Sequence, residues 1–164
     1  MIQLWGILKK KIKVIVYDFD GVMTDNKVYI DEKGKEMVRV NRADGLGVAE
    51  IKKLGIKQVI ISTEKNTVVS VRARKLGISC LQGIADKKIA LIDYCRKYNF
   101  VLKYVAYVGN DINDKEAMEI VGTTICPADA HESIKAISNH VLKTKGGNGI
   151  IRELLDLIIK LRGE

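Results

Sequence analysis

Short runs of β-branched and other apolar residues alternate along this chain with longer segments of helical periodicity. Six of the runs have the length of strands: residues 12–18, 58–62, 78–82, 104–108, 123–126 and 140–143. They are nearly continuous in apolar character, as expected of parallel strands that helices cover on both faces. The alternation therefore predicts an α/β fold with a Rossmann-like, doubly wound parallel sheet.

Segments with helical periodicity separate these runs. Three of them are residues 44–54, 67–76 and 86–98. Gly55 and Gly77 directly follow the first two, and glycine commonly ends a helix. Asp129 and Glu132 have the spacing of a capping box that would begin a further helix. A last helix is expected to follow the "GGNG" stretch and to continue through Leu161.

The stretch "KVYIDEKGKEMVRV", residues 27–40, breaks this alternation. It has the pattern of two strands around a turn at residues 32–34, which predicts a β-hairpin between the first strand and the first helix. We expect one domain over residues 1–164, because no linker, repeat or low-complexity tract divides the chain. The other connections are too short to hold a cap domain, so none is expected over the site.

Charge and aromatic content bear on the kind of partner. The chain has 28 Lys and Arg against 20 Asp and Glu, and the net charge of +8 favours anionic partners such as phosphates and acidic sugars. The basic residues are scattered, and one Trp, six Tyr and two Phe offer few rings for base stacking. We therefore expect a phosphorylated small molecule as the partner, and no nucleic acid.

The cysteines and the N-terminal residues indicate the compartment. Cys80, Cys95 and Cys126 are odd in number and far apart, which favours reduced thiols in a cytoplasmic protein over disulfides or a zinc site. In residues 1–11 a short apolar stretch that includes Trp5 precedes the lysines, which is the reverse of a signal peptide. We expect an amphipathic lead-in segment there, and no membrane insertion, because no stretch approaches a spanning length.

Acidic residues follow two of the expected strands. In "VIVYDFDGVMTD", alternation along a strand would direct Asp18 and Asp20 to the same side. In "YVGNDIND", Asn110, Asp111 and Asp114 come directly after the fourth strand. Ligands of doubly wound sheets bind at the carboxyl ends of such strands, so we expect the two clusters to face each other. Carboxylates this close need a compensating cation, and an oxygen-rich ligand set favours Mg²⁺; a set of turn and capping residues is the alternative.

The motif "DFDGVMTD" resembles the first motif of the haloacid dehalogenase superfamily, and the similarity in order and spacing runs through nearly the whole chain. The resemblance implies that Asp18 attacks phosphorus to form an aspartyl-phosphate. It implies that Asp20 protonates the leaving alkoxide and then activates water. Ser62, with Thr63 as the alternative, would bind the transferring phosphoryl group, and Lys87 would neutralise charge on the nucleophile and the phosphate. Taken alone, Ser62 and Lys87 would be interpreted as a helix cap and a solvated lysine.

One position departs from the pattern of the superfamily. Its fourth motif usually has a metal-binding aspartate directly after the glycine, where this chain has Asn110. An amide oxygen can bind Mg²⁺, but it removes one formal charge from the ligand set. The predicted metal ligands are Asp18, Asp20 and either Asn110 or Asp111. Asp114 is predicted to lie in the outer shell of the metal.

The hairpin, the missing cap domain and the motif "GGNGIIREL" together resemble the 3-deoxy-D-manno-octulosonate 8-phosphate phosphatase family. Members of that family are homotetramers in which a hairpin flap and a C-terminal segment of one subunit shape the site of another. The resemblance implies that Val28–Val40 is this flap. It also implies that Gly146–Arg152 reaches the site of a neighbouring subunit.

A branch of that family acts on nonulosonate 9-phosphates, and this chain resembles the branch in three polar residues, Glu64, Arg72 and Lys75. Together with Thr63 they are candidate substrate-binding residues. Arg72 and Lys75 are three apart on an expected helix, so both could point at an acidic sugar. A solvated helix face is the alternative for this pair.

Two functions are therefore compatible with the sequence. The first is a Mg²⁺-dependent phosphatase acting on a 2-keto-3-deoxy sugar acid phosphate, either a nonulosonate 9-phosphate or octulosonate 8-phosphate. The second is a weakly active or vestigial assembly module of a sialic-acid-type CMP-sugar synthetase. The intact acidic cluster favours the enzyme, because burying such charges without a use is costly, whereas Asn110 favours the module.

Overall fold

The computed structural model describes residues 11–163. The amphipathic segment expected at the N-terminus, including Trp5, lies outside the described residues except for Lys11. Within residues 11–163, none of the helices has both the length and the apolar character needed to span a membrane. The three cysteines are free.

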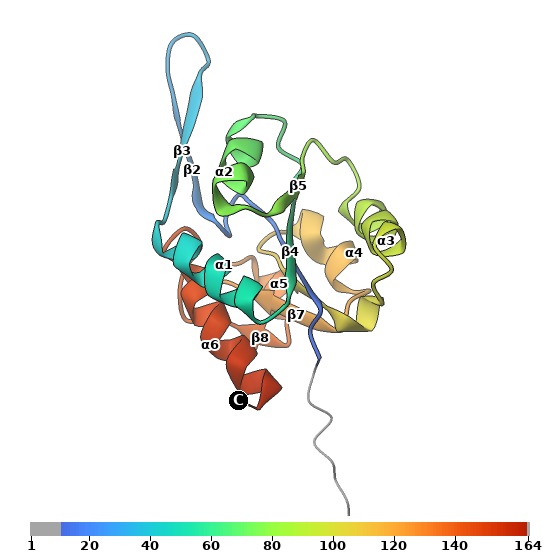
Figure 1. Cartoon of the computed structure of the whole chain (residues 1–164). Helices are drawn as coiled ribbons and strands as arrows, with labels where there is room; N and C mark the ends of the chain where they lie inside the picture. Colours follow the sequence, from blue (N-terminus) through green and yellow to red (C-terminus); the bar gives the residue numbers. More distant parts are fainter. Residues whose placement is uncertain (1–10, 164) are drawn as a thin grey trace, which may run out of the picture.

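Six parallel strands form one sheet in the order β5-β4-β1-β6-β7-β8. The strands are β1 (Val14–Tyr17), β4 (Lys57–Ile61), β5 (Ser79–Leu81), β6 (Val105–Val108), β7 (Thr123–Cys126) and β8 (His140–Val141). The first strand, β1, lies in the middle of the sheet, and the chain then moves to one edge through β4 and β5 before it returns to the other side of β1 through β6 (Figure 1). This order confirms the predicted doubly wound sheet, with its reversal point between β1 and β6.

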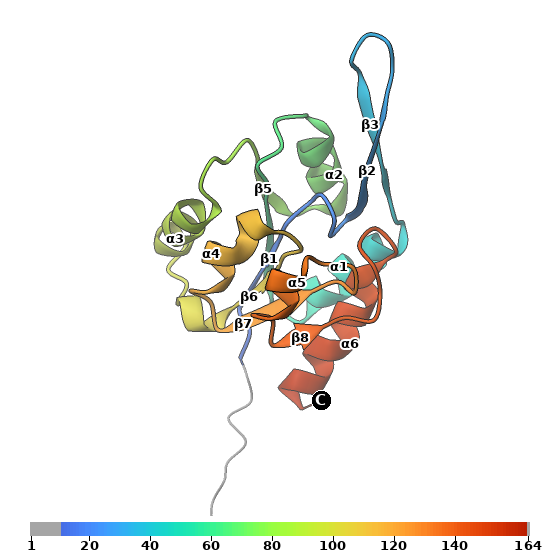
Figure 2. The ribbon, with the colours of Figure 1, turned by 180° about the vertical axis from the view of Figure 1, so that it is seen from behind.

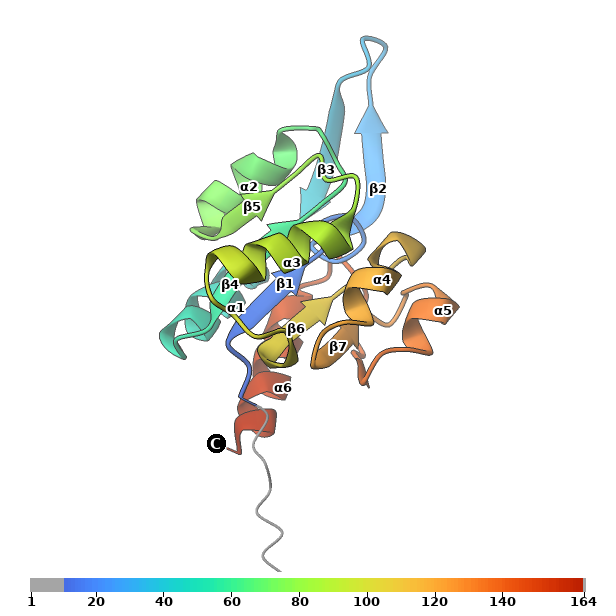
Figure 3. The same ribbon diagram turned by 90° about the vertical axis from the view of Figure 1, so that its right-hand side faces the viewer.

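Helices cover both faces of the sheet, as Figure 2 and Figure 3 show. One face carries α1 (Ala43–Lys53), α2 (Val68–Leu76) and α6 (Ile150–Arg162). The other carries α3 (Lys87–Lys97), α4 (Lys115–Met118) and α5 (Glu132–Lys135). Side chains of β1 alternate between two apolar clusters, Ile15 and Tyr17 on the first face and Val14 and Val16 on the second. Because both faces are covered, all four of these residues are fully buried.

The helices α1 and α6 pack closely against each other. A side-chain carbon added at Gly47 of α1 would lie 2.8 Å from the Ile151 side chain and 2.9 Å from its backbone. The two helices can therefore approach this closely only because position 47 has no side chain.

The hairpin consists of β2 (Thr24–Ile30) and β3 (Glu36–Val40), which pair with each other in a separate two-stranded sheet. It projects from the body of the molecule (Figure 1). Its apolar side chains are largely exposed, with exposed fractions of 67% for Tyr29 and 58% for Met37, which are cross-strand partners. Within residues 11–163 no cap domain is inserted between the elements of the sheet, as predicted.

One expectation about the C-terminal third was wrong. The capping box of Asp129 and Glu132 does not form, because α5 begins after His131, whose ring nitrogen Nδ1 accepts a hydrogen bond from the Ser133 N–H at 3.2 Å. The Asp129 carboxylate instead accepts one from the Gly146 N–H at 2.9 Å. The short helix α4 and the 3₁₀ turns before and after β6 (Leu102–Tyr104 and Ile112–Asp114) were not predicted from periodicity.

The start of the segment 146–152 packs on the loop after β1 of the same chain, and its predicted reach to the site of a neighbouring subunit stays a prediction. The Gly147 N–H donates to the Val22 carbonyl at 3.0 Å. A side-chain carbon at Gly146 or Gly147 would collide with the backbone between Gly21 and Asp25. The glycines of "GGNG" therefore allow two backbone segments to touch beside the end of β1.

Candidate active site

The carboxyl ends of β1 and β6 meet at the reversal point of the sheet. Tyr17 of β1 is paired with Val108 of β6, and the Asp18 N–H donates to the Val108 carbonyl at 2.9 Å. A cavity of about 350 Å³ opens at this edge. Its lining consists of Asp18, Asp20, Asn26, Ser62, Thr63, Asn110, Asp111, Ile112 and Asn113. The two acidic motifs therefore line one cavity.

The loop after β1 brings Asp20 to the cavity by a tight turn rather than by strand alternation. β1 ends at Tyr17. The Phe19 carbonyl then accepts hydrogen bonds from the N–H groups of residues 22–24. Gly21 adopts a positive φ of 83°, which favours glycine. The Thr24 hydroxyl oxygen accepts from the Gly21 N–H at 3.2 Å and lies 3.4 Å from Asp20 Oδ1, so it fixes the turn.

Lys87 forms a buried ion pair with two carboxylates. Its Nζ lies 2.8 Å from Asp18 Oδ1 and 2.7 Å from Asp114 Oδ1, and the side chain is almost fully excluded from solvent. Lys87 is the first residue of α3, whose N-terminus is capped by the Asp86 carboxylate, which accepts from the Ile89 N–H at 2.9 Å. The cap sets where α3 begins and so where Lys87 is held.

Asp114 is saturated with hydrogen-bond donors. Its Oδ2 accepts from the backbone N–H groups of Asn110 at 3.0 Å and Asp111 at 3.3 Å. Its Oδ1 accepts from Lys87 and from the Tyr107 hydroxyl at 2.9 Å. A carboxylate engaged by four donors has little capacity left for a metal ion, which agrees with an outer position for Asp114. Sequence reasoning missed Tyr107, since nothing distinguishes it from an ordinary core residue of a buried strand.

Three oxygen positions near Asp18 fit a magnesium ion. One end of the Asn110 amide lies 2.9 Å from the Asp20 carbonyl oxygen and 3.1 Å from Asp18 Oδ2. If that end is the amide nitrogen, it donates a hydrogen bond to both oxygens. If it is Oδ1, its distances to the other two oxygens are close to the separation of about 3 Å expected between adjacent ligands in a Mg²⁺ octahedron. The residues present therefore fit the ion through carboxylate, carbonyl and amide oxygens.

The same geometry distinguishes between the two candidates for the third ligand. Among residues 11–163, no group of three or more His, Cys, Asp or Glu side chains is placed to hold a metal. The Asp111 carboxylate caps a 3₁₀ turn, where it accepts from the Ile112 N–H at 2.7 Å. The geometry favours Asn110 over Asp111 as the third ligand, and for Asp20 it favours the carbonyl oxygen over the carboxylate.

Burial alters the acidity of both carboxyl groups of the first motif. Burial and the neighbouring Asp114 charge raise the pKa of Asp18 to about 7, although Lys87 acts in the opposite direction. The pKa of Asp20 is also raised, mainly by burial and then by the charge of Glu64. One buried and one half-buried acid beside a single ammonium group form a site that a divalent cation would stabilise electrostatically.

The end of β4 supplies the hydroxyl groups of the cavity. Ser62 is buried, and its Oγ accepts from the Glu64 N–H at 3.1 Å. Thr63 is exposed and lines the cavity together with Ser62. The Glu64 carboxylate accepts from the Asn66 N–H at 2.7 Å and does not line the cavity, but it is close enough to influence Asp20.

Arg72 and Lys75 do not line this cavity, and their predicted role in substrate binding stays a prediction. The guanidinium group of Arg72 turns toward α1, where Nη2 donates to the Asn41 carbonyl at 2.8 Å. Lys75 is exposed one turn further along α2, and neither residue lines the cavity. The pair was inferred from the resemblance and from its spacing on the helix, and the contact of Arg72 with the Asn41 carbonyl holds its guanidinium group outside the lining of the chain's own cavity.

Three residues of the lining were not predicted. Asn26 has a positive φ of 64° and lies at the irregularity of strand pairing between Thr24 and Val28, which turns it toward the cavity. Ile112 and Asn113 are contributed by the 3₁₀ turn after β6. A sequence signal existed for Asn26 only, because asparagine is among the few residues that adopt positive φ readily.

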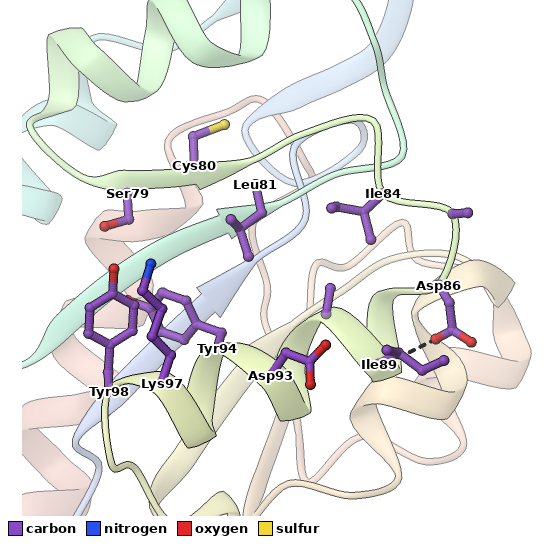
Figure 4. A pocket seen from close by; sticks show the side chains of 12 residues that line it. Ser79, Cys80, Leu81, Ile84, Asp86, Ile89, Asp93, Tyr94, Lys97 and Tyr98 are labelled. Carbon is purple, nitrogen blue, oxygen red and sulfur yellow. Dashed lines mark hydrogen bonds between the residues drawn. The ribbon is translucent and has the colours of Figure 1, made fainter.

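A second, larger pocket of about 670 Å³ lies between β5 and α3 (Figure 4). Its lining is mainly apolar and aromatic, with Tyr94 and Tyr98 at one end and Ile84 at the other. None of the predicted site residues lines it. Volume alone therefore does not select the acidic cavity as the candidate active site, and the chemistry of its lining does.

The fold and the acidic cavity define a haloacid dehalogenase-like hydrolase, and the chain belongs to this family, whose profile matches residues 49–154. A curated relative, the 3-deoxy-D-manno-octulosonate 8-phosphate phosphatase of Escherichia coli K12, is 35% identical over 156 residues. The match covers 94% of this chain and 83% of the relative.

Solved structures agree with this assignment. The phosphatase of the same name from Moraxella catarrhalis, in complex with magnesium, phosphate and KDO, has a TM-score of 0.90 and 33% identity, covering 96% of this chain and 91% of that one. A cobalt-bound deoxy-D-mannose-octulosonate 8-phosphate phosphatase from Haemophilus influenzae has a TM-score of 0.88 and 31% identity, covering 94% and 91%. The chain is thus an enzyme of a family that includes phosphoric monoester hydrolases, as predicted.

Proposed function

We propose that the protein is a Mg²⁺-dependent phosphatase that hydrolyses the phosphate ester of a 2-keto-3-deoxy sugar acid through an aspartyl-phosphate. The observation that carries this proposal is the buried ion pair of Lys87 and Asp18 beside a cavity that Asp18 itself lines. A buried carboxylate with one oxygen held by an ammonium group is positioned to act as a nucleophile rather than as a surface charge.

In the proposed reaction Asp18 attacks phosphorus, and the bond from phosphorus to the sugar oxygen breaks. The leaving alkoxide takes a proton from the Asp20 carboxyl group, which is half-buried at the same cavity. Asp20 then takes a proton from water as that water attacks the aspartyl-phosphate, so that phosphate leaves and Asp18 is restored. The Ser62 hydroxyl and the Lys87 ammonium group donate to the phosphoryl oxygens.

Asp18, the Asp20 carbonyl and Asn110 would hold Mg²⁺, with Asp111 as the other candidate for the third position. The ion would neutralise charge on the phosphate and on the attacking carboxylate. Asp114 would serve the site from outside, by holding Lys87 and the backbone of Asn110.

The substrate class follows from the relatives and from the cavity. The named relatives act on 3-deoxy-D-manno-octulosonate 8-phosphate, which supports a 2-keto-3-deoxy sugar acid phosphate. Ser62 and Thr63 line the cavity, and Glu64, the next residue along the chain, is part of the resemblance to the nonulosonate branch. We propose a nonulosonate 9-phosphate as the preferred substrate and octulosonate 8-phosphate as the second candidate.

We also propose a homotetramer in the cytoplasm. Exposed apolar residues on both strands of the hairpin support subunit contact through this element, because isolated hairpins of this kind are not stable in water. The free thiols of all three cysteines support a reducing compartment.

Asn110 favours a second candidate function. An amide in place of a carboxylate lowers the charge of the metal site, which is what a vestigial assembly module of a sialic-acid-type CMP-sugar synthetase would tolerate. Such a module has no need for an ion pair as closely held as that of Lys87 with Asp18, and we therefore rank it second.

The test is a panel of phosphorylated 2-keto-3-deoxy sugar acids incubated with the purified protein, with Mg²⁺ or with a chelator. We expect phosphate release that requires Mg²⁺ and is fastest with a nonulosonate 9-phosphate. Asp18→Asn is the control, since it keeps the shape and removes the nucleophile. Turnover no faster than that of Asp18→Asn on every substrate would contradict the phosphatase and favour the module.

A further inference from the structure

We propose that Tyr107 is a positioning residue of the active site, whose hydroxyl group holds Asp114 and thereby orients Lys87 toward Asp18 and the phosphoryl group. This inference deepens the proposed function and rests on it for the catalytic consequence. Tyr107 touches neither the cavity nor, in the proposed reaction, the substrate.

Three short contacts connect Tyr107 to the proposed nucleophile. Tyr107 is fully buried on β6, and its hydroxyl donates to Asp114 Oδ1 at 2.9 Å. The same oxygen lies 2.7 Å from Lys87 Nζ, and that ammonium group lies 2.8 Å from Asp18 Oδ1. Every side chain in this series is at least nine-tenths buried, so water cannot substitute readily for a missing donor.

The Tyr107 hydroxyl limits how many hydrogen bonds Lys87 can donate to Asp114. A carboxylate oxygen accepts along about two directions, and on Oδ1 these are used by Tyr107 and by Lys87. The ammonium group has three N–H bonds, of which one points to Asp114 and one to Asp18. With Tyr107 in place, Lys87 gives Asp114 a single hydrogen bond and keeps its third N–H for an oxygen of the phosphoryl group.

Loss of the hydroxyl would change this distribution. Asp114 would be left with a free acceptor direction on a buried, charged oxygen, and Lys87 is the nearest group able to fill it. We expect Lys87 to move toward Asp114 and away from Asp18. Burial, with the charges of Asp114 and Asp18, raises the pKa of Tyr107, which keeps the phenol protonated and able to donate.

A purely structural role is the alternative, and Tyr17 provides the matched control. Tyr17 is equally buried, lies on the neighbouring strand β1, and donates its hydroxyl to the Gln58 side chain at 2.8 Å. Its side chain packs in the cluster on the opposite face of the sheet from that of Tyr107. Both tyrosines therefore have a buried hydroxyl group with a hydrogen-bond partner, but only the partner of Tyr107, Asp114, belongs to the ion pair of the site.

The experiment compares Tyr107→Phe with Tyr17→Phe in the full chain. Each variant loses one buried hydroxyl hydrogen bond, so we expect both to have lower melting temperatures. Tyr107→Phe should lower kcat by roughly tenfold and leave KM within about twofold, because the positioned charge matters most in the transition state. Tyr17→Phe should keep both constants near those of the wild type.

A spectroscopic readout separates this proposal from the proposed function. The ¹⁵N resonance of the Lys87 ammonium group reports its hydrogen bonds whether or not a substrate is known. We expect that resonance to shift in Tyr107→Phe and to stay in place in Tyr17→Phe. If the wild type hydrolyses no phosphate ester, the phosphatase fails and the resonance still decides the positioning role. An unchanged resonance in Tyr107→Phe, or equal changes in both variants, would overturn the proposal.

Discussion

The ammonium group of Lys87 lies 2.8 Å from Oδ1 of Asp18, and both side chains are buried. The two residues come from the start of α3 and the end of β1, which only the doubly wound sheet brings together. A buried charge pair stabilises a protein only while both partners are present, because a single charge left in the interior has no compensation. This pair therefore links the stability of the fold to the integrity of the site.

Lys87→Met should destabilise the protein by about 3–5 kcal/mol, because it leaves the Asp18 and Asp114 carboxylates buried without their cation. It should also abolish phosphatase activity. Urea unfolding followed by circular dichroism measures the first effect. Adding Asp114→Asn to Lys87→Met should restore part of the stability and none of the activity.

Lys88→Met is the matched control for this variant. Lys88 is partly exposed, and its Nζ is 3.9 Å from the Glu116 carboxylate, so the change should cost less than about 1 kcal/mol. Equal losses of stability at positions 87 and 88 would show that the buried ion pair contributes nothing specific.

Asn110→Asp should tighten Mg²⁺ binding by roughly tenfold, since it adds a formal charge to the ligand set. In chelator the same variant should melt at a lower temperature than the wild type, because its carboxylate would lie beside Asp18 Oδ2, 3.1 Å from the present amide atom. Calorimetric titration and thermal melts with and without Mg²⁺ measure both effects. Asn113→Asp is the control, because it adds a charge at an exposed position of the cavity lining. It should change the Mg²⁺ affinity and the melting temperature in chelator less than Asn110→Asp does. Equal Mg²⁺ affinity in the wild type and in Asn110→Asp would argue against Asn110 as a ligand.

Gly21→Ala should weaken Mg²⁺ binding as well as stability. The added carbon would collide with the Asn110 side chain, and Gly21 has a positive φ of 83°. Gly34→Ala is the matched control, because Gly34 has a similar φ of 76° and no atom within 4 Å of the added carbon. Both variants should lose about 1 kcal/mol from backbone strain, and only Gly21→Ala should lose metal affinity in calorimetry. Equal Mg²⁺ affinities in the two variants would show that the close contact of Gly21 with Asn110 does not matter for metal binding.

The buried Asp44 should make stability depend on pH. Burial raises its pKa from 3.8 to about 6, although the Ile151 N–H and Arg72 act in the opposite direction. Between these values the folded state binds more protons than the unfolded chain, so the stability contributed by Asp44 is full at low pH and falls as pH rises to about 6. Above that pH the contribution is constant.

Asp44→Asn removes this titration. The unfolding free energy of the wild type, relative to that of Asp44→Asn, should therefore fall by up to about 3 kcal/mol from pH 4 to pH 7. Urea unfolding at several pH values measures the difference. Asp93→Asn, at an exposed position of α3, should show no such slope. A flat difference for Asp44→Asn would mean that Asp44 is ionised at pH 4 in the folded state.

Much of the fold was predictable from the sequence for a simple physical reason. Strands covered on both faces need continuous apolar runs, and each predicted run contains its observed strand, except that the run 58–62 is shifted by one residue from β4 (Lys57–Ile61). The predicted capping box at Asp129 failed because a side chain can bond a partner far away in sequence, here Gly146. Local spacing identifies possible partners of a polar group and does not choose among them.

The same limit applies to the site. Asp18, Asp20, Ser62 and Asn110 line one cavity because strand ends in a doubly wound sheet converge, which sequence order reveals. The contact of Arg72 with the Asn41 carbonyl was not predicted, because the direction of a helix face depends on which neighbour the helix packs against. The hydroxyl of Tyr107 could not be assigned a partner, since its contact with Asp114 exists only after β6 and the following turn have folded.

The exposed hairpin leads to a last prediction, on assembly. Tyr29 and Met37 are opposite each other on β2 and β3, with exposed fractions of 67% and 58%. If the hairpin forms subunit contacts, the double variant Tyr29→Ser/Met37→Ser should lower the mass measured by light scattering from that of a tetramer, because the contact loses its apolar area. Val71→Ser, 57% exposed on α2, is the control and should keep the wild-type mass. The fold of the monomer should survive in the double variant, because neither side chain belongs to the core. An unchanged mass would show that these hairpin side chains are not needed for the subunit contacts.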